Sequence, residues 1–246
     1  MIATLAKGLL SLALLTPTIY FATLLFNAIA TVPLSTGFQH ILSNAWATSA
    51  LIDYITAFPF IFPYVASRSN NTATSILLCA CCFFLGNVFT VPLFIYWILS
   101  IDSPSIRAAL LPHSQSTDPS THALNGVISK RVLGVYTAIT LVVFIGICVK
   151  ALDSGDPGFD FILNDTWSLV TFVDVLVGVQ LVILYVVVRE GPKSVVATIG
   201  WVVGLVLLGN GATCVYVLYL LWSSGAGGVK EVFLGSGGER TYVRLD

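Results

Sequence analysis

The sequence predicts an all-α membrane protein with six transmembrane helices arranged as a three-plus-three inverted internal repeat. Apolar residues make up 57% of the chain and charged residues only 9%, with a mean hydropathy of +0.93. These values lie far outside the range of soluble proteins. In addition, the segment from Thr16 to Arg68 recurs from Thr137 to Arg189 at a constant shift of 121 residues.

Six apolar stretches are long enough to cross a hydrocarbon layer of about 30 Å, which takes about 20 residues of helix. They lie near residues 8–30, 46–66, 73–99, 131–150, 167–188 and 195–222. Runs such as 181–188 do not alternate polar and apolar residues as the strands of a membrane barrel do. We therefore expect a first three-helix unit at 1–100, a polar linker at 101–130, a second unit at 131–222 and a flexible polar tail at 223–246.

The repeat continues into the third stretch of each unit, where a shift of 123 pairs Gly86-Asn87 with Gly209-Asn210. A unit of three crossings ends on the side opposite to the one on which it began. The second copy is therefore expected to lie upside down relative to the first. Many secondary transporters have inverted repeats, with a binding site near the middle of the membrane.

Asp53 and Asp174 are the only charged residues inside the predicted spans, apart from Arg131 and Lys150 at the ends of one span. From the rise of a helix, Asp53 and Asn87 are both expected about 10 Å below the same interface. The same arithmetic pairs Asp174 with Asn210 in the opposite leaflet.

Each carboxyl and amide pair has two interpretations. It is either a clasp between the second and third helices of its unit, which stabilises a membrane bundle by about 0.6–2 kcal/mol, or a proton site. A carboxyl in an apolar medium tends to stay a neutral acid that can give up a proton. Asp53 and Asp174 are therefore the candidate catalytic residues, with Asn87 and Asn210 as their binding or structural partners.

Four further repeated residues are secondary candidates. Trp46 and Trp167 lie where interfacial aromatic residues are expected, so anchoring is their first role and ligand contact the second. Arg68 and Arg189 end the second span of each unit, where extension to the headgroups is the default and anion binding the alternative.

The predicted six spans do not determine the orientation. They place Lys7, Arg68, Lys150, Lys230, Arg240 and Arg244 on one side and Arg107, Lys130, Arg131, Arg189 and Lys193 on the other, which is nearly an even division. Candidate glycosylation sites at Asn70 and Asn164 fall on the side of the termini. Use of either site would place the termini outside the cytosol.

Other sites are expected to be absent. No metal-ligand spacing or phosphate-binding loop is present, so we expect neither a metal nor a cofactor. Cys79 and Cys82 form a Cys-x-x-Cys pair, but Val202 and Leu205 replace them in the second unit, which favours apolar packing over redox chemistry. A net charge of −1 without a basic stripe argues against nucleic acid. The expected partners are the lipid bilayer and a lipophilic small molecule.

The order Trp46, Asp53, Arg68, Gly86-Asn87, Thr90 and Tyr96 resembles small three-helix integral membrane proteins classed as a domain of unknown function, here as two fused units. The second unit is the more similar, since Arg189-Glu190 has an acidic residue where the first unit has Ser69. The resemblance implies a membrane family without an established activity. It therefore supports the fold but supplies no mechanism.

Three functions remain open at this point. The first is a membrane-embedded enzyme of lipophilic, isoprenoid-like metabolism that uses an intramembrane aspartate as proton donor. The second is a proton-coupled small-molecule transporter. The third is a scaffold whose Asp and Asn residues only lock the bundle. The enzyme hypothesis predicts one closed cavity with a single Asp on its wall. The transporter hypothesis predicts a continuous aqueous path that both Asp residues reach. The scaffold hypothesis predicts no cavity, with both carboxyls bonded to Asn.

Overall fold

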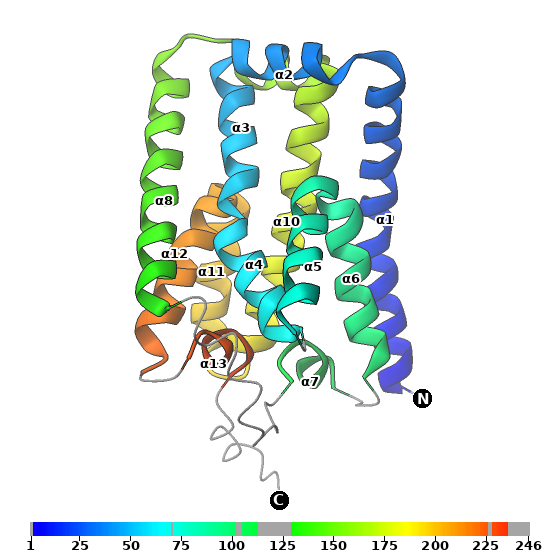
Figure 1. The fold of residues 1–246 in the computed structure, drawn as a ribbon, viewed down its shortest axis with the longest axis vertical. Helices are drawn as coiled ribbons and strands as arrows, with labels where there is room; N and C mark the ends of the chain where they lie inside the picture. Colours follow the sequence, from blue (N-terminus) through cyan, green and yellow to red (C-terminus); the bar gives the residue numbers. More distant parts are fainter. Residues whose placement is uncertain (1, 70, 102–104, 113–128, 226–227, 236–246) are drawn as a thin grey trace, which may run out of the picture.

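The computed structural model describes residues 2–69, 71–101, 105–112, 129–225 and 228–235, and the regular structure within these ranges is helical (Figure 1). Four helical stretches are long and apolar enough to cross a membrane: Thr4–Thr31, Ala45–Arg68, Lys130–Asp153 and Thr166–Glu190. The structure is therefore helical and compatible with a membrane protein, as the composition predicted.

The described residues of the first half form seven helices. They are α1 (Ile2–Thr31), α2 (Leu34–Ser43), α3 (Ala45–Thr56), α4 (Phe58–Arg68), α5 (Thr72–Leu85), α6 (Asn87–Ser100) and α7 (Ile106–Leu110). The second half contains α8 (Lys130–Asp153), α9 (Gly158–Asn164), α10 (Thr166–Glu190), α11 (Val195–Leu208), α12 (Asn210–Ser223) and α13 (Val229–Leu234). The α3–α4 pair of the first half corresponds to the single helix α10 of the second.

The third apolar stretch of each half is not one helix but two, separated by Gly86 or Gly209. Both glycines have a φ of 57°, a left-handed conformation that ends a helix and that residues with a Cβ rarely adopt. α5, α6, α11 and α12 have 14 residues each, which corresponds to about 21 Å. Each helix is thus too short to cross a hydrocarbon layer of about 30 Å.

The two short helices of each half fold back on each other as a hairpin (Figure 1). Lys7, near the start of α1, donates a hydrogen bond from Nζ to the carbonyl of Ile101 just after α6, at 2.7 Å. Lys130, at the start of α8, donates in the same way to Ser224 Oγ just after α12, at 3.0 Å. Both hairpins therefore return to the end of the bundle at which α1 and α8 begin.

We name that end the lower end, marked by α7 and α13, and the opposite one the upper end, marked by α2 and α9. At the upper end the indole of Trp167 donates to the carbonyl of Val32, and the amide of Ala45 donates to Asp156. The connection that follows α1 and the one that follows α8 thus lie at the same end of the bundle. The starts of α3 and α10 lie at that end as well. The two halves consequently run in the same direction.

The predicted six spans and their inverted arrangement are therefore not confirmed. The stretches 73–99 and 195–222 are long enough for one crossing, and their length alone does not distinguish a crossing from a hairpin. Because each hairpin returns to its own side, a half contributes two crossings. An even number of crossings brings the second copy into the membrane with the orientation of the first.

Parts of the predicted linker and tail are helical and packed. α7 lies within 101–130 and α13 within 223–246, and Leu110 and Phe233 in them are fully buried. Tyr64 donates a hydrogen bond to the carbonyl of Leu110 and Tyr185 to that of Phe233, at 2.8 and 2.6 Å. These matched contacts extend the repeat to residues 106–111 and 229–234, whose sequences share little beyond Leu111 and Leu234.

Candidate functional site

The two intramembrane aspartates bind the hairpins of the opposite halves. Asp53 of α3 accepts a hydrogen bond at Oδ1 from the backbone amide of Asn210, at 2.8 Å. Asp174 of α10 accepts at Oδ1 from the backbone amide of Asn87 at 3.1 Å and from its side-chain nitrogen at 2.8 Å. We call these contacts the two carboxylate clasps. Both aspartates are more than nine-tenths buried.

The predicted pairing of Asp53 with Asn87 and of Asp174 with Asn210 is therefore wrong, as is their placement in opposite leaflets. Helix rise gives the depth of a residue but not the direction in which it faces around the bundle. In the parallel arrangement the two hairpins turn at a similar level (Figure 1). Each carboxylate therefore reaches the hairpin of the other half.

The turn of each hairpin explains why a carboxylate lies there. α6 begins at Asn87 and α12 at Asn210, and the first amides of a helix have no partner within the helix. A negative charge at this position accepts such amides and is favoured by the helix dipole. The glycines allow the approach: a Cβ on Gly209 would lie 2.4 Å from Asp53 Oδ2, and one on Gly86 would lie 2.7 Å from Asp174 Oδ2.

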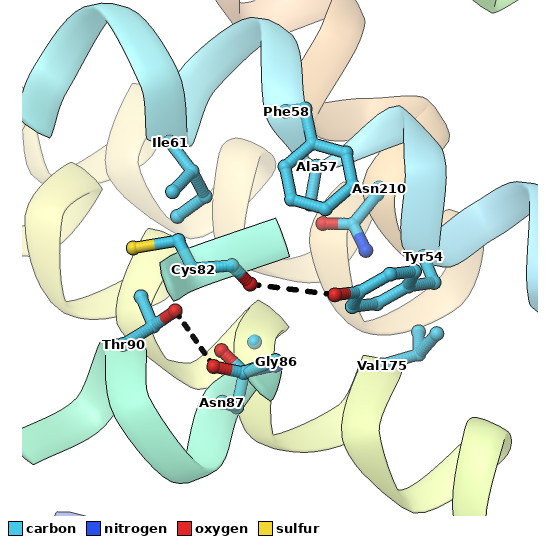
Figure 2. Close-up of a pocket in the computed structure, with 11 residues that line it drawn as sticks. Tyr54, Ala57, Phe58, Ile61, Cys82, Gly86, Asn87, Thr90, Val175 and Asn210 are labelled. Carbon is cyan, nitrogen blue, oxygen red and sulfur yellow. Dashed lines mark hydrogen bonds between the residues drawn. The ribbon is translucent and has the colours of Figure 1, made fainter. Parts of the chain in front are cut away.

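The two asparagine side chains are bonded differently. Asn87 Nδ2 donates to both the carbonyl and the carboxylate of Asp174, at 2.8 Å each. Asn210 instead accepts a hydrogen bond at Oδ1 from Thr213, at 3.1 Å. Asn210 is also one of the residues that line a cavity (Figure 2).

The cavity lies between the two hairpin turns and has a volume of about 10 Å³, which is room for about one water molecule. Its walls come from α3, α4, both hairpins and α10 (Figure 2). The lining residues are Tyr54, Ala57, Phe58, Ile61, Cys82, Gly86, Asn87, Thr90, Val175, Gly178 and Asn210. Neither aspartate is among them, so the two asparagines separate the carboxylates from the cavity.

Tyr54 closes one side of this cavity. Its hydroxyl donates to the carbonyl of Phe83 at 2.8 Å and lies 3.4 Å from that of Cys82, at the end of α5. The last carbonyls of a helix lack donors within the helix. Tyr54 therefore ties α3 to the hairpin of its own half. Sequence reasoning missed this residue because Val175 occupies the equivalent position of the second half.

The repeated tryptophans contact repeated glycines across the two halves. Trp167 packs against Gly37 of α2, where a Cβ would lie 2.0 Å from the indole ring. Trp46 packs against Gly158 of α9, where the corresponding distance is 3.6 Å. The tryptophans thus lie at the upper end of the second helices, as predicted, and there they join the halves.

The repeated arginines anchor the short helices of the lower end. Arg68 donates to the carbonyl of Ala109 in α7, and its guanidinium lies over the ring of Trp97, 4.8 Å from the centroid. Arg189 donates to the hydroxyl of Tyr185 and to the carbonyl of Phe233, at 2.6 and 3.2 Å. Arg189 Nε also lies 3.5 Å from the carboxylate of Glu190. Both arginines thus have partners within the protein.

Of the two candidate glycosylation triplets, the described residues lie at opposite ends of the bundle. Asn70 lies outside the described residues, and its neighbour Asn71 caps α5 at the lower end. Asn164 ends α9 at the upper end, where its side-chain nitrogen donates to the carbonyl of Asp160 at 2.7 Å. The prediction that both triplets share a side with the termini is therefore not confirmed.

Neither metal ligation nor disulfide formation is indicated in the part of the chain that the structure describes. No group of three or more His, Cys, Asp or Glu side chains there could hold a metal ion. All five cysteines are free thiols. Cys79 and Cys214 lie against helix carbonyls, those of Phe62 and Thr56.

Comparison with known proteins returned no match to a protein-family model, a curated protein or a solved structure. The resemblance to three-helix proteins of unknown function therefore stays a prediction. The two carboxylate clasps and the cavity are therefore the features from which a function can be inferred.

Proposed function

We propose that the protein is a membrane transporter that passes a small uncharged molecule between its two halves, with proton binding at Asp53 and Asp174 as the switch. The observation that carries this proposal is the cavity at the meeting point of the two hairpin turns. Helices broken at corresponding positions of two repeats are the best sequence indicator of a transporter binding site. Parallel repeats about an axis along the membrane normal are also known among transporters.

The lining indicates the kind of solute. The residues that line the cavity include no charged side chain, and the surface that they expose to it is almost entirely apolar. The hydroxyls of Tyr54 and Thr90 and the side-chain nitrogen of Asn87 are bonded to other groups of the protein. Such walls suit a small uncharged molecule. The volume of about 10 Å³ fits water or ammonia as the structure stands. A larger solute requires the hairpins to move apart.

The clasps supply a route to proton coupling. An ionised carboxylate binds the first amides of α6 or α12 more strongly than a neutral acid does, because both the hydrogen bond and the helix dipole favour negative charge. Protonation of Asp53 or Asp174 therefore weakens the hold of one half on the hairpin of the other. The hairpin turn is then free to move, and the cavity between the turns widens.

A scaffold is the second candidate, and a separate observation favours it. Both carboxylates are bonded to an asparagine of the opposite half, as expected if they only lock the bundle. The enzyme hypothesis receives the least support from this geometry. Neither aspartate lines the cavity, and about 10 Å³ does not accommodate an isoprenoid-like substrate.

Flux into liposomes separates the two candidates. The purified protein is reconstituted into vesicles. Water entry under an osmotic gradient is followed by light scattering, and ammonia entry is followed with a pH-sensitive dye inside the vesicles. The transporter predicts entry faster than in empty vesicles, with a pH dependence that Asp53→Asn and Asp174→Asn reduce. Asp160→Asn, on the exposed upper surface, is the matched control. Flux equal to that of empty vesicles at every pH would leave the scaffold.

A further inference from the structure

The positive charges of the chain gather at one end of the bundle. Among the described residues, eight lysines and arginines lie at the lower end and one, Lys150, lies at the upper end. The eight are Lys7, Arg68, Arg107, Lys130, Arg131, Arg189, Lys193 and Lys230. The six predicted spans instead divided the positive charges almost evenly between the two ends.

The change follows from the two hairpins. With six crossings, the segment after α6, the start of α8 and the end of α10 would lie on the side opposite to Lys7 and Arg68. Because the first hairpin turns back at Gly86, the segment after α6 and the start of α8 lie at the lower end, to which α10 then returns. The second hairpin turns back at Gly209 and keeps α13 at that end. Arg107 in α7 and Lys230 in α13 therefore join the charges at the starts of α1 and α8 and at the ends of α4 and α10.

Contacts of the described residues fix these side chains at the lower end. Lys7 bonds to Ile101, Lys130 to Ser224 and Gly225, and Arg68 to Ala109. Each contact joins the first or last turn of a long helix to a segment near α7 or α13. The placement thus depends on the packing of the bundle and not only on the count of helices.

The upper end has the opposite composition. Its connections, 32–44 and 154–165, contain no lysine or arginine. Asp153, Asp156, Asp160 and Asp165 lie there instead. Lysines and arginines in short connections near the ends of membrane helices are retained on the cytosolic side, whereas acidic residues contribute little to orientation.

We propose that the lower end, with α7 and α13, faces the cytosol and contacts the anionic headgroups of the cytosolic leaflet. The upper end, with α2 and α9, faces the lumen or the exterior. Both hairpins then enter the membrane from the cytosolic side, and Asn164 lies on the side where glycosylation takes place. This inference rests on charge placement and is independent of the proposed transport.

Thiol labelling in sealed microsomes, whose cytosolic face is outside, tests the orientation. The five native cysteines are replaced by alanine or serine, and one new cysteine is introduced by Arg131→Cys at the lower end or by Asp160→Cys at the upper end. Both positions are exposed, so neither change disturbs packing. A membrane-impermeant maleimide should label the Arg131→Cys variant directly and the Asp160→Cys variant only after detergent.

The reverse pattern, or labelling of both variants before detergent, would overturn the proposal. A second measurement guards against a variant that fails to fold. A short glycosylation-acceptor tag is placed between Ser154 and Gly155, or after Asp246, in the wild-type sequence. Modification of only the first tag is expected, and modification of only the second would contradict the orientation.

Discussion

The second membrane helix differs between the two halves although the repeat covers both. α10 runs without interruption from Thr166 to Glu190, whereas the equivalent stretch of the first half is divided at Ala57 into α3 and α4. Pro59 follows this break and has no amide to donate to the carbonyl of Ile55. Gln180 occupies the equivalent position of α10. The comparison shows that one half carries a break beside the cavity and the other a continuous wall.

The contacts of the second membrane helix near this break also differ between the two halves. Tyr54 of the first half bonds to the carbonyl of Phe83, whereas its counterpart Val175 only lines the cavity. In the second half Glu190, buried at the lower end, accepts a hydrogen bond from Tyr216 of α12 at 3.0 Å and forms an ion pair with Lys193. Ser69 replaces Glu190 in the first half. We therefore expect α3 and α4 to be the part that moves and α10 with its hairpin to be the frame.

The largest expected effect comes from the hairpin turn itself. Gly209→Ala places a Cβ 2.4 Å from Asp53 Oδ2 at a φ of 57°, so strain and overpacking together should cost about 2–5 kcal/mol. Gly86→Ala, with 2.7 Å to Asp174 Oδ2, should cost slightly less. Thermal unfolding in detergent measures both.

Two glycines serve as controls for that series. Gly155 has a φ of 70° but no atom within 4 Å of its Cβ position, so Gly155→Ala should cost only the conformational part, about 1–2 kcal/mol. Gly200 lies in α11 with nothing within 4 Å, and its replacement by alanine should be neutral or stabilising. If Gly209→Ala proved no worse than Gly155→Ala, the close contact with Asp53 would be refuted.

Loss of a clasp charge should have the next largest effect. Asp174→Asn and Asp53→Asn keep an accepting oxygen but remove the negative charge at the start of α6 or α12, which should cost about 1–3 kcal/mol. Both hydrogen bonds to the Asp174 carboxylate come from Asn87 of the opposite half, whereas the Asp53 carboxylate accepts one from Asn210 of the opposite half and one from Thr56 of its own helix. Only the bonds from the opposite half hold the two halves together. The Asp174 variant should therefore be the less stable of the two, and equal or reversed midpoints would argue against this difference between the halves.

Removal of the Tyr54 hydroxyl tests the proposed difference in mobility. Tyr54→Phe keeps the ring and deletes the bond to Phe83, with an expected loss of stability of about 1 kcal/mol. Cys82 lines the cavity and is 1% exposed, so its alkylation by a small thiol reagent should become several-fold faster. Tyr20→Phe on the exposed face of α1 is the control. An unchanged rate in the Tyr54 variant would mean that α3 is not a gate.

The smallest effect concerns the caps of the second helices. Asn44 caps α3 and Asp165 caps α10. Partial burial alone would raise the pKa of Asp165, but hydrogen bonds from Ser168 and His40 outweigh it and hold the pKa below its ordinary value. Because the folded-state pKa is lowered, the contribution of Asp165 to stability is present above about pH 4 and is lost as the pH falls further.

The unfolding midpoint, followed between pH 6 and pH 3, should therefore fall less steeply in Asp165→Asn than in the wild-type protein. Asparagine still caps the helix, so the comparison isolates the charge. An identical pH dependence of the two proteins would remove this role of Asp165.

The sequence predicted a helical chain with stretches long and apolar enough to cross a membrane, and its matched polar positions singled out Asp53, Asp174, Asn87 and Asn210, because apolar length and repeated residues are properties of the chain itself. It could not predict the partners of those residues. Whether residues 73–99 cross the membrane depends on one backbone conformation at Gly86, and that choice decides the direction of the second half. The pairing of Asp53 with Asn210 follows only once the halves are parallel. Tyr54 was not identified because Val175 replaces it in the second half, and α7 was not identified because its sequence shares little with that of α13.

The most direct test of the account is the alkylation rate of Cys82 as a function of pH, with the other four cysteines replaced. The rate in Asp53→Asn or Asp174→Asn is divided by the rate in the protein that has both aspartates. The pH dependence of the thiol's own reactivity is common to both rates and therefore drops out of this ratio. If ionised carboxylates hold the cavity closed, this ratio should be several-fold while the aspartates are charged and should fall toward one as the pH is lowered and they take up protons. A ratio of one at every pH would contradict the claim that the clasps control the cavity.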